Sequence, residues 1–437
     1  MSSEKEISVP VAIAIGLGAI IGAGIFVLSG TAIAIAGGYA LVAFVLVGIA
    51  AMFVSIEIGE LSSIMPKETG SSYSFTYKAF GSELGFITGM LLFFSYSTAI
   101  SVISLGFGSY LSSIMDLSPS LNLPFAISLI FVLSILNIMG IKKAAKADSF
   151  LVAIKVSILT LFVFAALFLS FSKHTFSFSN FSAPQGNIIL SIFSASVVIF
   201  FAYSGFQTIS TFASKVKGKN GAPRAIVFAT LISLVLYVLV VFSLMALIPA
   251  NQYKISGDPL SFALREVNAP EWVFIIVDIG ALIATTSATI AMILSSSRII
   301  YQISKDGLLP KFFRKYDSEK DVAINGVIAS SLIGILMLFS GNIYVIAAIS
   351  NFGLLFSYLM SSFSLIHFRR NKIEGSFKTP FYPYLTIFTI IALFGFIIGM
   401  PKTALILGTI LVIVLLSTYY MLRELKKKEP VMIKLFD

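Results

Sequence analysis

Long apolar stretches separated by short polar breaks occupy most of the chain. Each stretch has few charges and is about as long as the 20 residues that a helix needs to cross a bilayer. The breaks carry charged residues or Pro, Gly and Asn. This pattern predicts an all-α integral membrane protein with twelve spanning helices. They are expected at residues 8–36, 39–65, 82–112, 122–140, 147–171, 187–214, 223–249, 272–304, 322–340, 343–368, 381–399 and 402–422.

The composition agrees with this pattern and excludes several kinds of chemistry. Of 437 residues, 57% are hydrophobic and 11% charged, which is typical of a polytopic membrane protein. The first apolar segment begins near Ser8 and has no evident small-residue cleavage site, so we expect a retained helix rather than a signal peptide. Cysteine is absent, which excludes disulfides, thiolate metal sites and cysteine nucleophiles. No cofactor or metal is expected.

The positive charges predict the orientation of the chain. With the N-terminus inside, most Lys and Arg fall in cytoplasmic loops and in the tail, while Lys173, Lys254, Arg265 and Lys402 fall outside. This bias predicts that both termini are cytoplasmic. The net charge of +10 therefore indicates topology and affinity for anionic lipids rather than nucleic-acid binding. The basic tail at 423–437 is expected to lie along the inner leaflet.

Two spans carry small residues at membrane depth. The first contains "IIGAGIF" at 20–26, and the sixth contains "FFAYSGFQ" at 200–207. Glycine weakens a helix, and paired interruptions in two inverted halves indicate the midplane binding site of a transporter. The alternative is that these glycines only permit close helix packing. Two breaks separated by five spans favour the transporter hypothesis.

A pair of broken helices offers backbone groups of both polarities. The half-helix after a break begins with unpaired amides, which suit a carboxylate, and the half-helix before it ends with unpaired carbonyls, which suit an ammonium. A zwitterion such as an α-amino acid matches both. Phe200, Phe201, Tyr203 and Phe206 are then expected to line or cap the pocket, although each alone could be an ordinary packed aromatic residue.

At these residues the sequence resembles the amino acid–polyamine–organocation superfamily of secondary transporters, and the resemblance covers nearly the whole chain. Six motifs occur in the family's order: "GLGAIIGAGIF", "ELSSIMPKETGSSYSF", "FFAYSGF", "RIIYQISKDGLLPKFF", "SNFGLLFSYL" and "FKTPFYP". The resemblance implies one transporter domain over 1–437 with a five-plus-five inverted repeat. The repeats would span 8–171 and 187–368, with two additional helices at 381–422.

The resemblance also implies the roles of particular residues. The substrate carboxylate would meet the backbone at Gly22, Ala23 and Gly24. The amino group would meet carbonyls near Ile20, Phe201, Ala202 and Ser204, and Phe201 would act as an occluding gate. Gln207 stands where relatives often carry an acidic residue, which puts a charged role there in doubt.

Lys155 is an unusual charge within the fifth span, roughly 12–14 Å from its start at 1.5 Å per residue. From position alone it could face the protein interior or snorkel to the cytoplasmic interface. The resemblance to proton-coupled members implies that it substitutes for a sodium ion, between the broken first helix and the hydroxyls of Thr286 and Ser287.

These patterns together predict a secondary active transporter in the cell membrane, carrying neutral amino acids of broad specificity with protons. An exchanger, or a permease for cationic amino acids or polyamines, is the alternative. An enzyme would need a catalytic cluster and a channel would need a continuous polar lining, and neither pattern is present in the sequence. Glu60 is expected to anchor a loop. Asp278, in the eighth span, could pair with another residue or face an aqueous vestibule.

Overall fold

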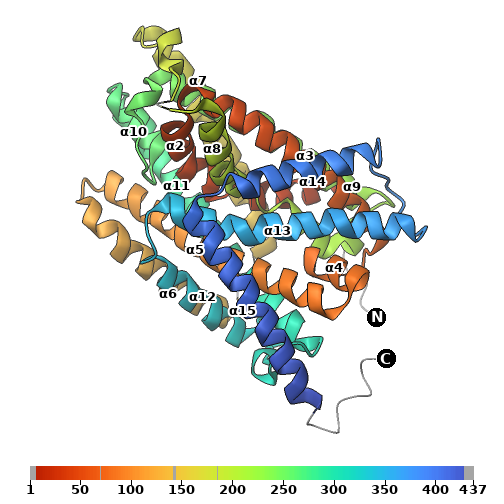
Figure 1. The fold of residues 1–437 in the computed structure, drawn as a ribbon. Helices are drawn as coiled ribbons and strands as arrows, with labels where there is room; N and C mark the ends of the chain where they lie inside the picture. The colour runs from red at the N-terminus through yellow and green to blue at the C-terminus, as the bar shows by residue number, and fades with distance from the viewer. Residues whose placement is uncertain (1–5, 69, 141–143, 185, 428–437) are drawn as a thin grey trace.

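The computed structural model describes residues 6–68, 70–140, 144–184 and 186–427, which form a bundle of helices (Figure 1). The α-helices are α1 (Val9–Ile20), α2 (Ala23–Ala36), α3 (Ala40–Ile64), α4 (Ser72–Phe80), α5 (Ser82–Ile114), α6 (Asn122–Met139), α7 (Ala144–Ser172), α8 (Ile188–Ala202), α9 (Gly221–Leu247), α10 (Pro259–Glu266), α11 (Glu271–Lys305), α12 (Ile324–Met337), α13 (Ile343–Arg370), α14 (Tyr384–Ile398) and α15 (Lys402–Lys427). The 3-10 helices are η1 (Gly37–Tyr39), η2 (Pro119–Leu121), η3 (Phe178–Phe181), η4 (Phe206–Lys215), η5 (Ala250–Gln252) and η6 (Lys311–Arg314). No β-strand occurs within these residues.

A helix, or a pair of helices interrupted by a break, lies at each predicted span. Within the described ranges, nine stretches are long and apolar enough to cross a membrane by length and composition. The apolar helices α1, α12 and α14 are shorter, with 12, 14 and 15 residues. The nearly all-helical architecture agrees with a multi-pass membrane fold, while the count of twelve spans stays a prediction.

Helix α5 forms the centre of the bundle. It packs against α11, α13 and α6, and 94% of its most apolar window is enclosed by the protein. Only 17% of the corresponding window of α15 and 28% of that of α6 are enclosed. Figure 1 shows α6 side by side with α12 along one edge of the bundle. The bundle therefore has an enclosed core helix and a periphery.

The peripheral helices expose large apolar side chains. Phe131 on α6 and Phe164 and Phe168 on α7 are 61–71% exposed, and Ile398 at the end of α14 is 75% exposed. A soluble protein rarely presents so many large apolar side chains to water, because each would be more stable in an apolar phase than in water. This surface is therefore suited to lipid.

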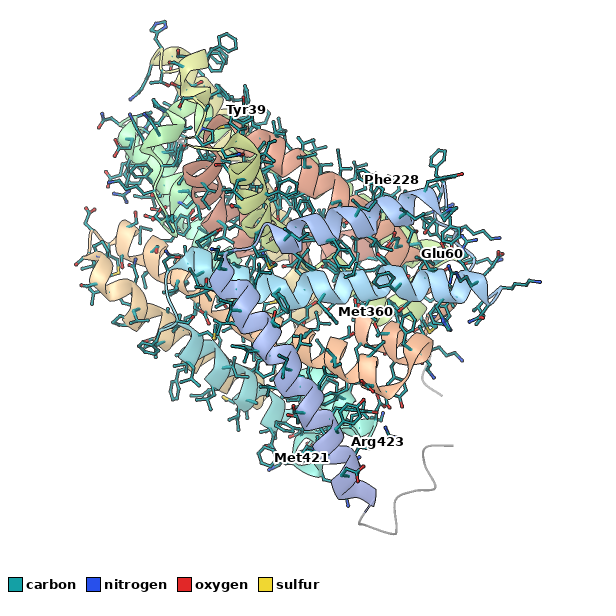
Figure 2. The ribbon with its side chains drawn as sticks, viewed as in Figure 1. Tyr39, Glu60, Phe228, Met360, Met421 and Arg423 are labelled. Carbon is teal, nitrogen blue, oxygen red and sulfur yellow. The ribbon has the colours of Figure 1, made fainter. Side chains whose placement is uncertain are left out.

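A buried ion pair fixes the end of α3 to α13. Glu60 is fully buried, and one of its oxygens lies 2.6 Å from Nε of Arg369. The other oxygen accepts hydrogen bonds from Nη2 of Arg369 at 3.1 Å and from the backbone N–H of Thr379 at 2.7 Å. Figure 2 shows Glu60 at the end of the bundle where α13 and the chain leading to α14 meet. The predicted loop-anchoring role of Glu60 agrees with these contacts.

Replacing Glu60 with Gln should lower the free energy of unfolding by about 3 kcal/mol, because the largely buried Arg369 would lose its buried counter-ion and keep only the exposed Glu374. Thermal unfolding of the purified protein in detergent checks this. Glu374→Gln is the control, since Glu374 is an exposed partner of the same arginine and should leave the melting temperature unchanged. Equal melting temperatures for Glu60→Gln and wild type would contradict the prediction.

Candidate functional site

Two helix breaks face one another inside the bundle. The first separates α1 from α2, where Ile21 and Gly22 leave helical geometry with Gly22 at φ −97° and ψ −145°. The second follows α8, and Gly205 adopts φ +114° before η4 begins. That φ is accessible to glycine at little cost and is strained for other residues. Both predicted interruptions are thus present as real breaks in the helices.

The segment after the second break is a 3-10 helix rather than an α-helix. The ten residues of η4 contain a kink at Phe212, whose φ and ψ are −131° and 27°. A 3-10 helix of more than three or four residues is uncommon, because its hydrogen-bond geometry is poorer than that of an α-helix. The sixth predicted span is therefore an α-helix in its first half and a tighter helix in its second half.

The breaks pack closely because glycine lacks a side chain. A Cβ placed on Gly24 would overlap the Cα of Ala202, so the start of α2 lies directly against the end of α8. A Cβ on Gly205 would overlap the carbonyl oxygen of Ala19, so the end of α1 lies against the start of η4. Each half of one broken helix thus contacts a half of the other.

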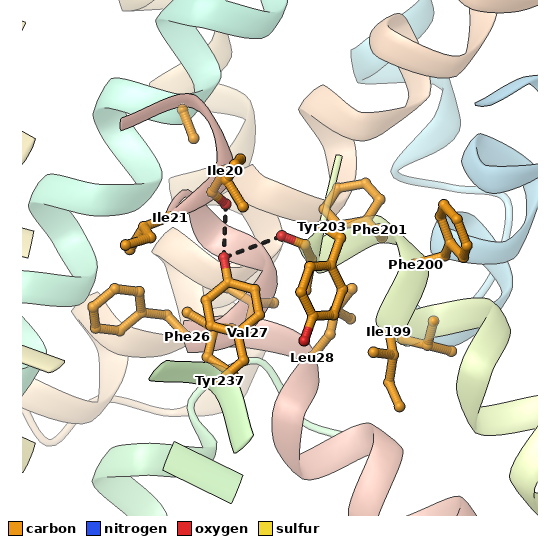
Figure 3. Close-up of a cluster of buried hydrophobic side chains, with 14 of the residues drawn as sticks. Ile20, Ile21, Phe26, Val27, Leu28, Ile199, Phe200, Phe201, Tyr203 and Tyr237 are labelled. Atoms are coloured by element: carbon orange, nitrogen blue, oxygen red, sulfur yellow. Dashed lines mark hydrogen bonds between the residues drawn. The ribbon is translucent and has the colours of Figure 1, made fainter. Parts of the chain in front are cut away.

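The hydroxyl of Tyr237 on α9 joins the two breaks. It donates to the carbonyl oxygen of Ile20 at 2.8 Å and lies 3.1 Å from that of Ala202, as the dashed lines in Figure 3 show. Ile20 O also accepts the backbone N–H of Gly22 at 2.7 Å. These are two of the carbonyls that the resemblance assigns to a substrate amino group. Their protein partner, Tyr237, lies outside the motifs, so the sequence did not reveal it.

Other predicted residues of this region are also brought together. Ser204 bonds back to the carbonyl oxygen of Phe201 through both its hydroxyl, at 2.7 Å, and its N–H, at 3.1 Å. The Phe201 side chain is buried, with 4% exposure. A Cβ on Gly22 would lie 3.0 Å from that of Ala288 on α11, so the first break also contacts α11. For Ala23, which opens α2, the structure describes the backbone position only.

Lys155 lies fully buried on α7 and contacts two other helices. Its Nζ donates to the hydroxyl of Ser287 on α11 at 2.7 Å and to the carbonyl oxygen of Gly18 on α1 at 3.4 Å. Thr286, the neighbour of Ser287, is half-buried. The ammonium group therefore bridges α1, α7 and α11, facing the interior rather than snorkelling to an interface.

Over most of its length the chain is similar to known transport proteins. Residues 7–420 match the profile of the family described as amino acid permease. The chain belongs to the amino acid permease family. It is 29% identical to the methylthioribose transporter of Bacillus subtilis, over 89% of this chain and 86% of that protein. It is 28% identical to the branched-chain amino acid permease BcaP of the same organism, over 85% and 83%. It is also 28% identical to the mitochondrial cationic amino acid transporter 3 of Arabidopsis thaliana, over 83% and 62%.

This permease is thus a transporter rather than an enzyme.

Gln207 is part of the enclosed interior of the protein. The side-chain amide of Gln207 donates to the Tyr96 hydroxyl on α5 and accepts from the Ser72 hydroxyl on α4 at 3.1 Å. Ser361 on α13 donates to the same Ser72 hydroxyl at 2.9 Å. The uncharged amide thereby links η4 to three neighbouring helices. From the sequence it was evident that Gln207 replaces an acidic residue of many relatives, but this hydrogen-bond network was not.

Replacing Gly205 with Ala should destabilise this permease strongly, because the new methyl group meets both an unfavourable φ and the backbone of Ala19. Gly218→Ala is the matched control, since Gly218 has φ +91° but open space around it. We expect Gly218→Ala to cost about 1 kcal/mol from φ strain alone. Thermal unfolding in detergent should show a clearly larger loss for Gly205→Ala, and equal losses would contradict the close approach of α1 and η4.

Proposed function

We propose that the protein is a secondary active transporter that carries neutral amino acids together with protons by alternating access. The observation that carries this proposal is that two broken helices meet inside the bundle. In addition, Lys155 of α7 links α1, the first half of the first broken helix, to α11. A transporter needs a central site and an element with two arrangements that both substrate and coupling ion can bias. In this proposal the two breaks form the central site, and the helices that Lys155 links form the element with two arrangements.

The proposed substrate site binds a zwitterion through the backbone. The amides at the start of α2, at Ala23 and Gly24, would receive the carboxylate, because the first turn of a helix has no intrahelical acceptors and carries a partial positive charge. The Gly22 amide would join them only on leaving Ile20 O, to which it donates. Ala202 O would accept the ammonium with its second lone pair. Ile20 O already receives two donors, so an ammonium would reach it only if Tyr237 moved. Phe201 would close the site.

Lys155 would couple transport to protons. With its proton, the ammonium group offers a charge and donors to Gly18 O and Ser287, which favours the arrangement with α1 held against α7 and α11. Loss of the proton removes the charge and one donor, which weakens this arrangement. Proton binding and substrate binding would then act on the same equilibrium. Thr286, beside Ser287, would complete the hydroxyl-bearing face.

Neutral substrates are supported by the residues of η4. A substrate with a cationic side chain would need a nearby carboxylate. At the position where relatives often carry an acidic residue, this chain has the uncharged amide of Gln207. The relatives include a branched-chain amino acid permease and cationic amino acid transporters, and a methylthioribose transporter as well. Family membership alone therefore does not decide the substrate. The alternative is an exchanger, whose uptake would depend on internal amino acid rather than on a proton gradient.

The proposed topology places twelve spans in the cell membrane with both termini inside. Residues 8–171 and 187–368 would form the inverted repeats, 381–422 the two additional helices and 423–437 a tail at anionic lipids. The order of elements supports this division. A broken pair opens each half, α1 with α2 and α8 with η4, and longer helices follow.

Replacing Lys155 with Ala should abolish proton-driven accumulation of amino acids. Proteoliposomes would be tested with a panel of labelled amino acids, with and without an inward proton gradient. Lys402→Ala is the control, because this exposed lysine at the start of α15 should leave uptake unchanged. Wild-type uptake that ignores the gradient but requires internal amino acid would identify an exchanger and contradict the symport proposal.

Replacing Tyr237 with Phe should raise KM for the transported amino acid by about tenfold, because its hydroxyl would no longer hold the carbonyls of Ile20 and Ala202, and with them the two breaks, in position. Tyr253→Phe is the matched control. This tyrosine, in the chain after α9, is also buried, and it donates at 2.7 Å to the carbonyl oxygen of Leu244 near the end of α9 rather than at the breaks. The two variants should lose similar stability, and a KM change shared by both would contradict a role for Tyr237 in the site.

A further inference from the structure

A separate cavity lies at the opposite end of the bundle from the Glu60 ion pair. Its volume is about 520 Å³, and it is lined by the end of α5, the start of α6, the turn between α12 and α13, and residues 255–258 before α10. In the proposed topology all of these segments face the outside. The volume is sufficient for a small metabolite.

The cavity is lined by polar groups that lack partners. Ser112 is only 4% exposed, yet among the residues that the structure describes its Oγ has no hydrogen-bond partner. Asn122 donates from its amide nitrogen to Ser109 at 3.1 Å, while its Oδ1 likewise has no partner within the described part of the chain. Buried polar groups cost free energy unless they are paired, so either oxygen would gain a partner if its side chain turned toward a donor in the cavity.

The wall of the cavity also carries a carboxylate, that of Asp258. Asp258 is half-buried in its wall, and Arg265 on the adjacent α10 is the nearby cation that favours its ionised form. Arg265 is shared, however, with Asp116 at 3.5 Å and with the fully buried Asp278 at 3.6 Å. Burial raises the pKa of the Asp258 carboxyl, while Arg265 and the hydroxyls of Ser113 and Ser256 oppose this shift. A further cation beside Asp258 would be favourable.

We infer that this cavity is a recruitment site that binds the ammonium group of an amino acid before it reaches the helix breaks, with Asp258 as its counter-ion. The inference rests on the proposed function, since it names an external site for the same substrate class. An ammonium has three donors and no acceptor, which matches a carboxylate, the Ser112 hydroxyl and the Asn122 carbonyl oxygen. The substrate's carboxylate would point to water.

The cavity wall is connected to the first half of the transport site. Gly257 packs against Ser109 and Gly106 of α5, and Gly106 in turn packs against Val27 of α2. One residue beyond Ser109, the Tyr110 hydroxyl donates to the carbonyl oxygen of Phe26 at 2.6 Å. A ligand in the cavity therefore contacts α5, the helix that packs against the first turns of α2. This position suits a site that precedes the breaks on an inward route.

The test uses L-leucinamide, which keeps the primary ammonium of an amino acid but lacks the carboxylate needed at the start of α2. Binding to the purified full-length protein would be measured by the shift of its melting temperature with ligand concentration. We expect Asp258→Asn to weaken binding by about tenfold, through loss of a charge-assisted hydrogen bond. Glu271→Gln removes a charge from the exposed start of α11, at the same end of the protein but outside the cavity, and should leave binding unchanged.

Two further variants distinguish a ligand site from a structural role. Ser112→Ala, which removes only an unpaired hydroxyl, should weaken binding severalfold and decides the question if Asp258→Asn does not fold. Tyr237→Phe should leave leucinamide binding unchanged. Absence of binding to wild type, or equal weakening by Asp258→Asn and Glu271→Gln, would overturn the inference. If leucinamide binding depends on Asp258 while no amino acid is taken up into proteoliposomes, the recruitment site stands and the proposed function falls.

Discussion

The close approach of two interrupted helices is the contact on which the rest of the structure depends. Gly24 lies against Ala202 and Gly205 lies against Ala19, and a single methyl group at either glycine would separate the pairs. Because the backbones touch, amides and carbonyls that have no partner within a regular helix collect in one place. Elsewhere in a membrane such groups would be too costly to expose to lipid. Here they are enclosed, and they can serve a polar ligand without charged side chains.

The polar side chains around the breaks follow from the same constraint. Tyr237 connects Ile20 and Ala202, Lys155 connects α1 to α11, and Gln207 connects η4 to its neighbours. Each has its partners on a different helix, so each contact fixes the relative position of two elements that are far apart in the sequence. A rigid-body movement of one helix would exchange several of these bonds together, which favours discrete arrangements over gradual deformation.

Much of this arrangement is predictable from the sequence, and the rest depends on contacts that no local pattern records. The apolar stretches predicted the helices, and Gly22 and Gly205 predicted the breaks, because glycines at matching depths of two inverted halves are typical of discontinuous helices. Lys155 stood out as a charge in an apolar helix. Tyr237 and Asp258 did not, since a tyrosine in a span and an aspartate before a proline are ordinary, and only the folded chain brings them to Ile20 and to the cavity.

The 3-10 geometry of η4 makes this segment longer than an α-helix with the same number of residues. A 3-10 helix rises about 2.0 Å per residue and an α-helix about 1.5 Å, so the stretch from Phe206 to the kink at Phe212 spans roughly 12 Å in one form and 9 Å in the other. Rewinding this stretch would draw the kink toward the break at Gly205 by about 3 Å without breaking the chain's connection to α8 or α9.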